Sequence, residues 1–366
     1  MSRSFLQTAI TDRFGLQSPI FGFSHSVETV AAISNAGGFG VYGATRRLPG
    51  EIDAELAQIR SLVGNKPFGV DLVIPAVIPQ ENDRSAMEKL IPDEHRGFVQ
   101  NLEAKYKVPK GTRPAMRTRF IRSQEITALQ VSAVINSSVD LVALGVGCPP
   151  DVVEQVKRAG KTTLALVGQE KHALKAIEAG ADILVAQGTD AGGHTGTVGT
   201  FSLVPRIVKL AGDVPVLAAG GVATGDHIVA ALAMGAVGVW VGTAFLLTTE
   251  NASHLTTNER QALINAQATD TVITRAESGK TFRQTRSAWS EEWAAPDAPQ
   301  PLGHPLHDVL IGDLLGAIRE HDVQPLAHSG AGQGIGWFDQ VRPSAQVIDD
   351  LMAQAEASFS RLQGAR

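Results

Sequence analysis

The sequence predicts an α/β protein, a (β/α)8 TIM barrel with a small, mainly helical cap domain inserted after the eighth strand. Short β-branched runs alternate with amphipathic stretches, and Gly, Pro, Asp or Asn lie in the turns between them, which is typical of βα units. The length of 366 residues suits a barrel of roughly 250 residues with an appended piece. A doubly wound open sheet is the alternative, because periodicity alone does not exclude it.

Eight segments are predicted as buried parallel strands, and in the later half of the chain they recur at the spacing that a barrel requires. They are Ile20–Phe23, Phe39–Tyr42, Phe68–Leu72, Leu141–Ala143, Thr163–Leu166, Ile183–Gln187, Val216–Ala218 and Val237–Val241. Helices are expected from Asp151 to Gly160, from Gln169 to Gly180 and after Thr224, since caps and glycine stops mark their ends.

Two segments interrupt this repeat. Residues from about 75 to 125 form a polar insertion after the third strand, too long for a βα loop. Its basic run, Lys105 to Arg122, is expected to be a solvated face, with contact to an anionic partner as the alternative. Residues 251–328 are expected to form the helical cap, leaving 1–250 and 329–366 as the barrel. A last helix is predicted from Ser344 to Leu362.

The composition favours a protein that acts on a small-molecule substrate. The net charge of −5 offers no positive field for nucleic acid or an anionic membrane. Cys148 is the only cysteine, which excludes an internal disulfide and fits a reducing compartment, so a cytoplasmic location is expected. The uncharged stretch Ile228–Leu247 is interrupted by glycines and is interpreted as a buried helix and strand rather than a membrane span.

The segment QGTDAGGHTG, from Gln187 to Gly196, directly follows a predicted strand. It therefore lies at the carboxyl-terminal mouth of the barrel, where active sites of this architecture form. Its glycines allow close approach to a flat ligand, and His194 can accept a proton or hold an anion. The alternative is a flexible loop with an incidental histidine. His25, which follows the first strand, is a second candidate for the substrate side.

Two glycine turns follow consecutive strands at the same mouth. Gly220 and Gly221 end the seventh strand, and Gly242 with Thr243 ends the eighth. Barrels commonly hold a phosphate there on backbone N–H groups, although a purely structural role is the alternative. The sequence has no P-loop, no dinucleotide fingerprint, no His-Glu-x-x-His metal motif and no serine nucleophile elbow.

The segments NAGGFGVYGA, KPFGVDL, ILVAQGTDAGGHTG, VLAAGGVATGDHIVAALAMGAVGVWVGTAF and GQGIG resemble the nitronate monooxygenase family, formerly called 2-nitropropane dioxygenases. The resemblance covers most of the chain from Pro19 to Leu247, but not residues 75–125. It implies bound FMN and makes His194 the active-site histidine. The implied cofactor contacts are Asp71, Gln187, Gly192, Gly193, Gly220, Gly221, Trp240, Val241, Gly242 and Thr243.

By this resemblance the reaction is oxidation of an alkyl nitronate with O2 to a carbonyl compound and nitrite, with a homodimer as one expected assembly. Two other functions stay open: an NAD(P)H-dependent FMN reductase acting on an enoyl thioester or quinone, and a non-catalytic phosphate-binding barrel. Two positions depart from the family pattern. Asp71 replaces the usual Asn, and an ionised Asp could not donate to the flavin. The sequence around His25 is also unusual.

Overall fold

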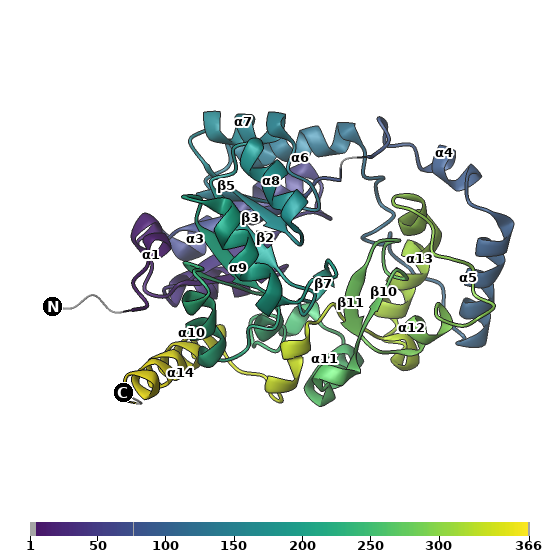
Figure 1. Ribbon diagram of the computed structural model, residues 1–366. Coiled ribbons are helices and arrows are strands. Elements are labelled where there is room, and N and C mark those ends of the chain that lie inside the picture. Colours follow the sequence, from purple (N-terminus) through teal and green to yellow (C-terminus); the bar gives the residue numbers. More distant parts are fainter. Residues whose placement is uncertain (1–4, 76, 365–366) are drawn as a thin grey trace.

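A computed structural model describes residues 5–75 and 77–364, and its central element is a closed barrel of eight parallel strands (Figure 1). Around the barrel the strands follow the order β1-β2-β3-β4-β5-β6-β8-β9. Their bounds are β1 Ile20–Ser24, β2 Phe39–Gly43, β3 Phe68–Val73, β4 Leu141–Gly145, β5 Thr162–Val167, β6 Ile183–Gln187, β8 Val216–Ala219 and β9 Gly238–Val241. All eight predicted strands are confirmed, and closure of the sheet excludes the doubly wound alternative.

Large and small apolar side chains fill the inside of the barrel, as expected for strands buried on both faces. Phe21 and Phe39 stack with ring centroids 4.6 Å apart, and Leu141, Leu164 and Leu217 are fully buried beside them. The barrel is therefore a packed core, and a ligand can enter only at an end.

Helices cover the outside of the barrel. Their bounds are α1 Ala9–Phe14, α2 Val27–Asn35, α3 Pro49–Val63, α6 Gln124–Asn136, α7 Pro150–Arg158, α8 Glu170–Glu178, α9 Thr200–Ala211, α10 Gly225–Ala233 and α14 Ser344–Gly364. The helices predicted after Asp151, Gln169 and Thr224, and the one at the end of the chain, are thus confirmed. Helix α14 packs closely on α10. The contact leaves no room for a side chain at Gly225, where a Cβ would lie 2.0 Å from the backbone nitrogen of Ala355.

The segment expected as a helical cap contains helices and also a small sheet. Its helices are α11 Thr257–Asn265, α12 Ala288–Glu292 and α13 Leu306–Glu320. Strands β10 Thr271–Thr274 and β11 Phe282–Thr285 form an antiparallel hairpin, and β11 pairs with the two-residue strand β7, Gly193–His194. This sheet, absent from the sequence-based prediction, joins the cap to the glycine-rich segment of the barrel mouth.

The insertion after β3 packs against the cap (Figure 1). It contains α4 Arg84–Lys89 and α5 Asp93–Lys105, and both helices contact α13. Leu102 of the insertion shares a hydrophobic cluster with Trp289 and Trp293, which are 0% and 6% exposed. These tryptophans pack inside the cap and against the insertion, and they do not line the cavity.

The prediction of a solvated basic face was wrong for the end of the basic run. Arg122 is buried, and Arg117 and Arg119 are largely buried in ion pairs. The acidic partner of Arg117 is Glu277, far away in the sequence, which is why local pattern could not reveal it. The exposed basic residues of the run lie in its first half: Lys105, Lys107, Lys110 and Arg113.

Across the described part of the chain, no helix is long and apolar enough to cross a membrane. The uncharged stretch from Ile228 to Leu247 instead forms the end of α10, the strand β9 and the short 3-10 helix η1, Thr243–Phe245. Its interpretation as a buried helix and strand is confirmed.

Candidate active site

A cavity of about 2160 Å3 opens at the carboxyl-terminal ends of the barrel strands and extends under the cap. Every residue proposed for the site from the sequence lines this one cavity: His25, Asp71, Gln187, Gly192, Gly193, His194, Gly220, Gly221, Trp240, Val241, Gly242 and Thr243. The predicted residues come from five of the eight barrel strands or the loops that follow them, so barrel closure is what brings them together.

The glycine wall of the cavity consists of residues 220–222 and 242–243. Gly220 and Gly221 have φ values of 98° and 74°, a conformation that glycine adopts without strain. In the described part of the chain, the backbone N–H groups of Gly221, Val222 and Gly242 have no protein acceptor. Thr243 Oγ1 accepts the Gly332 N–H at 2.9 Å, so its own hydrogen remains available. These donors can surround an anion without a cationic side chain.

A side-chain hydrogen bond and a strand pairing fix the backbone of His194. Gln187 Nε2 donates to the His194 carbonyl oxygen at 2.6 Å, and β7 pairs with β11 so that His194 lies opposite Phe282. The imidazole Nε2 lies 2.8 Å from Ser278 Oγ. Burial, with repulsion by Lys280 and then by two arginines, lowers the pKa of His194 to about 3. The imidazole is therefore neutral near pH 7, and a permanent positive charge is excluded as its means of holding an anion.

Asp71 lies at the end of β3 and is 7% exposed. Burial raises the pKa of its carboxyl to about 7, although the positive charge of Arg122 acts in the opposite direction. A carboxyl with this pKa is substantially protonated at neutral pH, and a protonated carboxyl donates a hydrogen bond. The departure from Asn at this position therefore does not remove the donor.

His25 faces the cavity from the end of β1. Its Nδ1 lies 2.8 Å from the Gly43 carbonyl oxygen, which can only accept, so Nδ1 carries the hydrogen. Burial lowers the pKa of His25 despite this hydrogen bond, and Arg47 acts in the same direction. The neutral ring then presents Nε2 as an acceptor.

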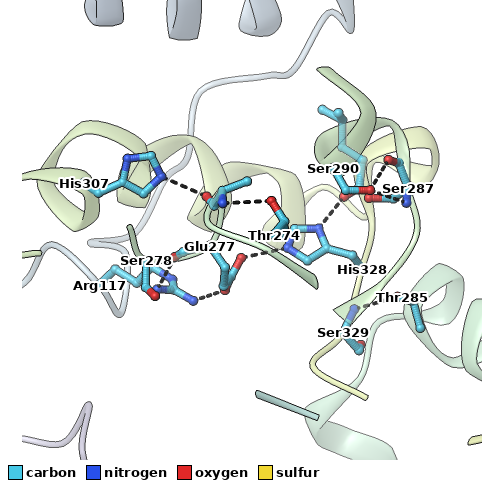
Figure 2. Close-up of polar contacts among 12 residues, drawn as sticks. Arg117, Thr274, Glu277, Ser278, Thr285, Ser287, Ser290, His307, His328 and Ser329 are labelled. Carbon is cyan, nitrogen blue, oxygen red and sulfur yellow. Dashed lines mark hydrogen bonds and ion pairs between the residues drawn. The ribbon is translucent and has the colours of Figure 1, made fainter. Parts of the chain in front are cut away.

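Figure 2 shows a buried chain of charges in the cap, centred on Glu277. Arg117 pairs with one carboxylate oxygen, and His328 Nε2 lies 2.9 Å from the other. His328 Nδ1 lies 2.8 Å from the Leu326 carbonyl oxygen. Burial tends to raise the pKa of Glu277, but Arg117 and His328 lower it to about 2. Because both neighbours of His328 can only accept, its imidazole is doubly protonated, consistent with its raised pKa. This chain fixes the loop that carries Ser278.

A second buried carboxylate joins the cap to the barrel. Asp308 of α13 accepts from Arg46 at 2.8 Å and from Arg117 at 3.1 Å, and His304 Nε2 lies 3.4 Å away. Burial tends to raise the pKa of Asp308, but Arg46, His304 and Arg117 lower it well below its usual range. Since Arg46 follows β2 and Arg117 belongs to the insertion, this one carboxylate links three parts of the chain.

We refer to Arg46, Arg117, Arg122 and Lys280, which all line the cavity, as the cationic wall. Sequence analysis included Arg117 and Arg122 only as members of the basic run Lys105 to Arg122, and it did not single out Arg46, Lys280 or Ser278. One signal was present: an insertion that leaves the barrel mouth after β3 must return there, so its last residues, including Arg122, end at the mouth. The cap residues had no comparable signal, because only the pairing of β11 with β7 brings their loop over His194.

One residue of the cavity lining has an unusual backbone conformation. Val146, at the end of β4, lines the cavity with φ 67°. Such a conformation is rare for a β-branched residue, costs on the order of 1–3 kcal/mol, and tends to cluster at functional sites.

The chain is similar to known proteins along nearly its whole length. The family model "Nitronate monooxygenase" matches residues 3–354. The chain is 38% identical to the Mycobacterium tuberculosis protein "Putative monooxygenase Rv1533", over 98% of this chain and 99% of that protein. It is 30% identical to a "Probable nitronate monooxygenase" of Staphylococcus aureus, over 94% of this chain and 96% of that protein.

Among solved structures, the nitroalkane oxidase of Streptomyces ansochromogenes is similar, with a TM-score of 0.80 and 28% identity. The similarity covers 97% of this chain and 100% of that chain. The match to the family model extends through the barrel, the insertion and the cap. The chain therefore belongs to the nitronate monooxygenase family and is an oxidoreductase.

Proposed function

We propose that FMN is the flavin of this oxidoreductase and that its substrate is an alkyl nitronate, oxidised with O2 to a carbonyl compound and nitrite. The observation that carries the proposal is the meeting of two features in one cavity. One is a set of unpaired backbone N–H groups suited to a phosphate, and the other is a buried, neutral imidazole suited to a small substrate.

The glycine wall fits the phosphate of FMN. A Cβ at Gly242 would have only Phe23 Cδ1 within 4 Å, at 3.9 Å, so there is open space beside Gly242 in the cavity that Gly221 and Val222 also line. The hydroxyl of Thr243 adds a further donor. When bound, FMN would accept electrons from the nitronate and pass them to O2, which is chemistry that no side chain supplies.

Asp71 would hold the ring of the cofactor as a protonated carboxyl. Its pKa of about 7 leaves the neutral form available at physiological pH, and burial further favours that form next to an apolar ring. The residue thereby replaces the amide donor expected at this position.

His194 would handle the substrate proton. A nitronate is already deprotonated, so toward this substrate the neutral imidazole needs only to orient an oxygen atom. With a neutral nitroalkane, the ring must accept the α-proton, and a bound anion beside it would raise its pKa toward the working range. Ser278, at 2.8 Å from Nε2, keeps the ring in one orientation during either task.

The test is anaerobic mixing of the purified protein with propyl-2-nitronate in the absence of NADH. We expect purified or FMN-reconstituted protein to absorb at about 450 nm, and the nitronate alone to bleach this band. Bleaching by NAD(P)H but not by nitronate would instead identify the reductase alternative. Protein that stays colourless with added FMN would leave only the phosphate-binding barrel.

A further inference from the structure

The cationic wall contains more positive charge than its acidic partners neutralise. Arg46 and Arg117 pair with Asp308 and Glu277. Arg122 differs from both: among the described residues it forms no ion pair, and its Nε has no hydrogen-bond partner. Its only hydrogen bond runs from Nη1 to the Val73 carbonyl oxygen, at 2.7 Å.

Burial makes this unpaired charge expensive. The Arg122 side chain is 5% exposed and lines the cavity. A buried charge is normally paired, because desolvation of an isolated one costs several kcal/mol. Burial, with repulsion by Arg46 and Arg117, outweighs attraction by Asp308 and Asp71 and lowers the pKa of Arg122 to about 9, so the guanidinium stays charged at neutral pH. An anion entering the cavity would remove this penalty.

Lys280 brings a second unpaired cation to the same place. It lies on the loop between β10 and β11, which is tied to the β7 segment because Thr281 Oγ1 donates to the Thr195 carbonyl oxygen at 2.7 Å. Burial and the charge of Arg122 lower the pKa of Lys280, and Lys280 in turn is the leading charge acting on His194. The position of Lys280 near His194 also follows from the strand pairing, because Phe282, two residues after Lys280, lies opposite His194.

We propose that Arg122 and Lys280 form a subsite that holds a planar, two-oxygen organic anion beside His194. A guanidinium can donate to both oxygens of such a group, and the ammonium adds a point charge. Nitronates and carboxylates share this shape and charge. The inference rests on the proposed function only in naming a nitronate, rather than a carboxylate, as the anion that is oxidised. It assigns recognition of the anion to Arg122 rather than to the imidazole of His194.

The cofactor phosphate is not the anion that this subsite fits. Arg122 is tied to the end of β3, whereas Gly220 and Gly221 follow β8. These strands are diametrically opposite in the order of the barrel, and the glycine wall already offers unpaired donors for a phosphate. The two anion sites therefore lie on different sides of the cavity.

The test uses butanoate as a probe of the subsite and butanamide as its uncharged equivalent. Isothermal titration of the FMN-bound protein gives both dissociation constants without any turnover. We expect wild-type protein to bind butanoate, and butanamide to bind at least about tenfold more weakly, as for loss of a charge-assisted hydrogen bond. Equal affinity for the two probes would overturn the proposal.

Variants locate the binding. Arg122→Gln and Lys280→Gln should each weaken butanoate binding about tenfold or more and leave butanamide binding unchanged. Lys110→Gln removes a positive charge from an exposed position of the same insertion that does not line the cavity, and it should leave butanoate affinity within about twofold of wild type. If Arg122→Gln does not fold, Lys280→Gln still tests the proposal, because Lys280 is half-buried on a loop.

A separate titration with FMN distinguishes the two possible anions. Arg122→Gln should bind FMN as tightly as wild type. Loss of FMN affinity with unchanged butanoate affinity would place the phosphate at Arg122 and overturn the subsite. The protein could also bind butanoate as expected and yet fail to oxidise nitronates. That result would refute the proposed function and leave the anion subsite supported.

Discussion

The two walls of the cavity are built for anions in different ways. The glycine wall offers backbone N–H groups, which are neutral and rigidly placed by two turns after β8 and β9. The cationic wall offers guanidinium and ammonium groups from the insertion, the cap and the loop after β2. Backbone donors are part of the barrel itself, whereas Arg46 and Arg117 of the cationic wall are held by carboxylates remote in the sequence. In the account proposed above, the barrel supplies the cofactor site and the added segments supply selectivity for the substrate anion.

The largest expected effect comes from filling the glycine wall. Gly242→Leu puts a side chain into the open space proposed for the phosphate, and should weaken FMN binding by about 10³-fold, because several charge-assisted hydrogen bonds are lost together. Butanoate binding at the cationic wall should persist. The measurement is an absorbance titration with FMN, and Gly199→Ala, where an added Cβ meets nothing within 4 Å, is the control. FMN affinity within about threefold of wild type would refute a phosphate site here.

Replacement of His194 should affect the oxidation of a neutral nitroalkane much more than that of its nitronate. His194→Asn should lower kcat/KM for a neutral nitroalkane by about 10² to 10⁴, the usual contribution of a general base. The effect on the corresponding nitronate should be at most about tenfold, because no proton has to be removed. Steady-state kinetics on FMN-loaded variant measures both. An equal loss for the two substrates, or none for either, is incompatible with a proton-accepting role.

Removing a carboxylate tests whether the cationic wall depends on its acidic partners. Asp308→Asn leaves Arg46 and Arg117 short of a buried partner and should reduce the free energy of unfolding by about 3–5 kcal/mol. Thermal unfolding measures the loss as a lower Tm. Asp226→Asn breaks an exposed pair with Arg361 and should leave Tm unchanged. Equal Tm values for wild type and Asp308→Asn would mean that the wall holds its shape without this carboxylate.

A last prediction concerns the pH dependence that Asp71, which lines the same cavity, gives to stability. The pKa of Asp71 is raised in the folded protein to about 7 from 3.8, so the folded state retains a proton that the unfolded state releases. Its contribution to stability is full below about pH 4 and is lost as the pH rises to about 7. Relative to Asp71→Asn, wild type should therefore lose a few kcal/mol across this window. Urea unfolding at a series of pH values measures the difference, and a constant difference would show that the folded pKa is not raised.

The barrel and the glycine wall could be predicted from the sequence because their signals are local. A β-branched run followed by Gly220 and Gly221, or by Gly242 and Thr243, specifies a strand and a turn within about ten residues. Barrel closure then brings the turns together without further information. The position of His194 followed from the same reasoning, since it lies just after β6.

The cationic wall could not be predicted in this way, because its contacts are remote in sequence. Arg117 is buried only because Glu277 and Asp308 arrive from the cap. The hairpin that carries Lys280 was missed because β10 and β11 are four residues each. Their sheet is completed by two residues of β7, which no local pattern distinguishes from a loop. Long-range ion pairs and short strand pairings are the features that sequence periodicity does not encode.

A crystal structure of the protein with FMN and butanoate tests the assignment of the two walls most directly. The account predicts the FMN phosphate within hydrogen-bonding distance of the backbone nitrogens of Gly221 and Gly242. It predicts the carboxylate on Arg122, facing His194. A phosphate bound by Arg122, or a carboxylate lying on the glycine wall, would contradict it.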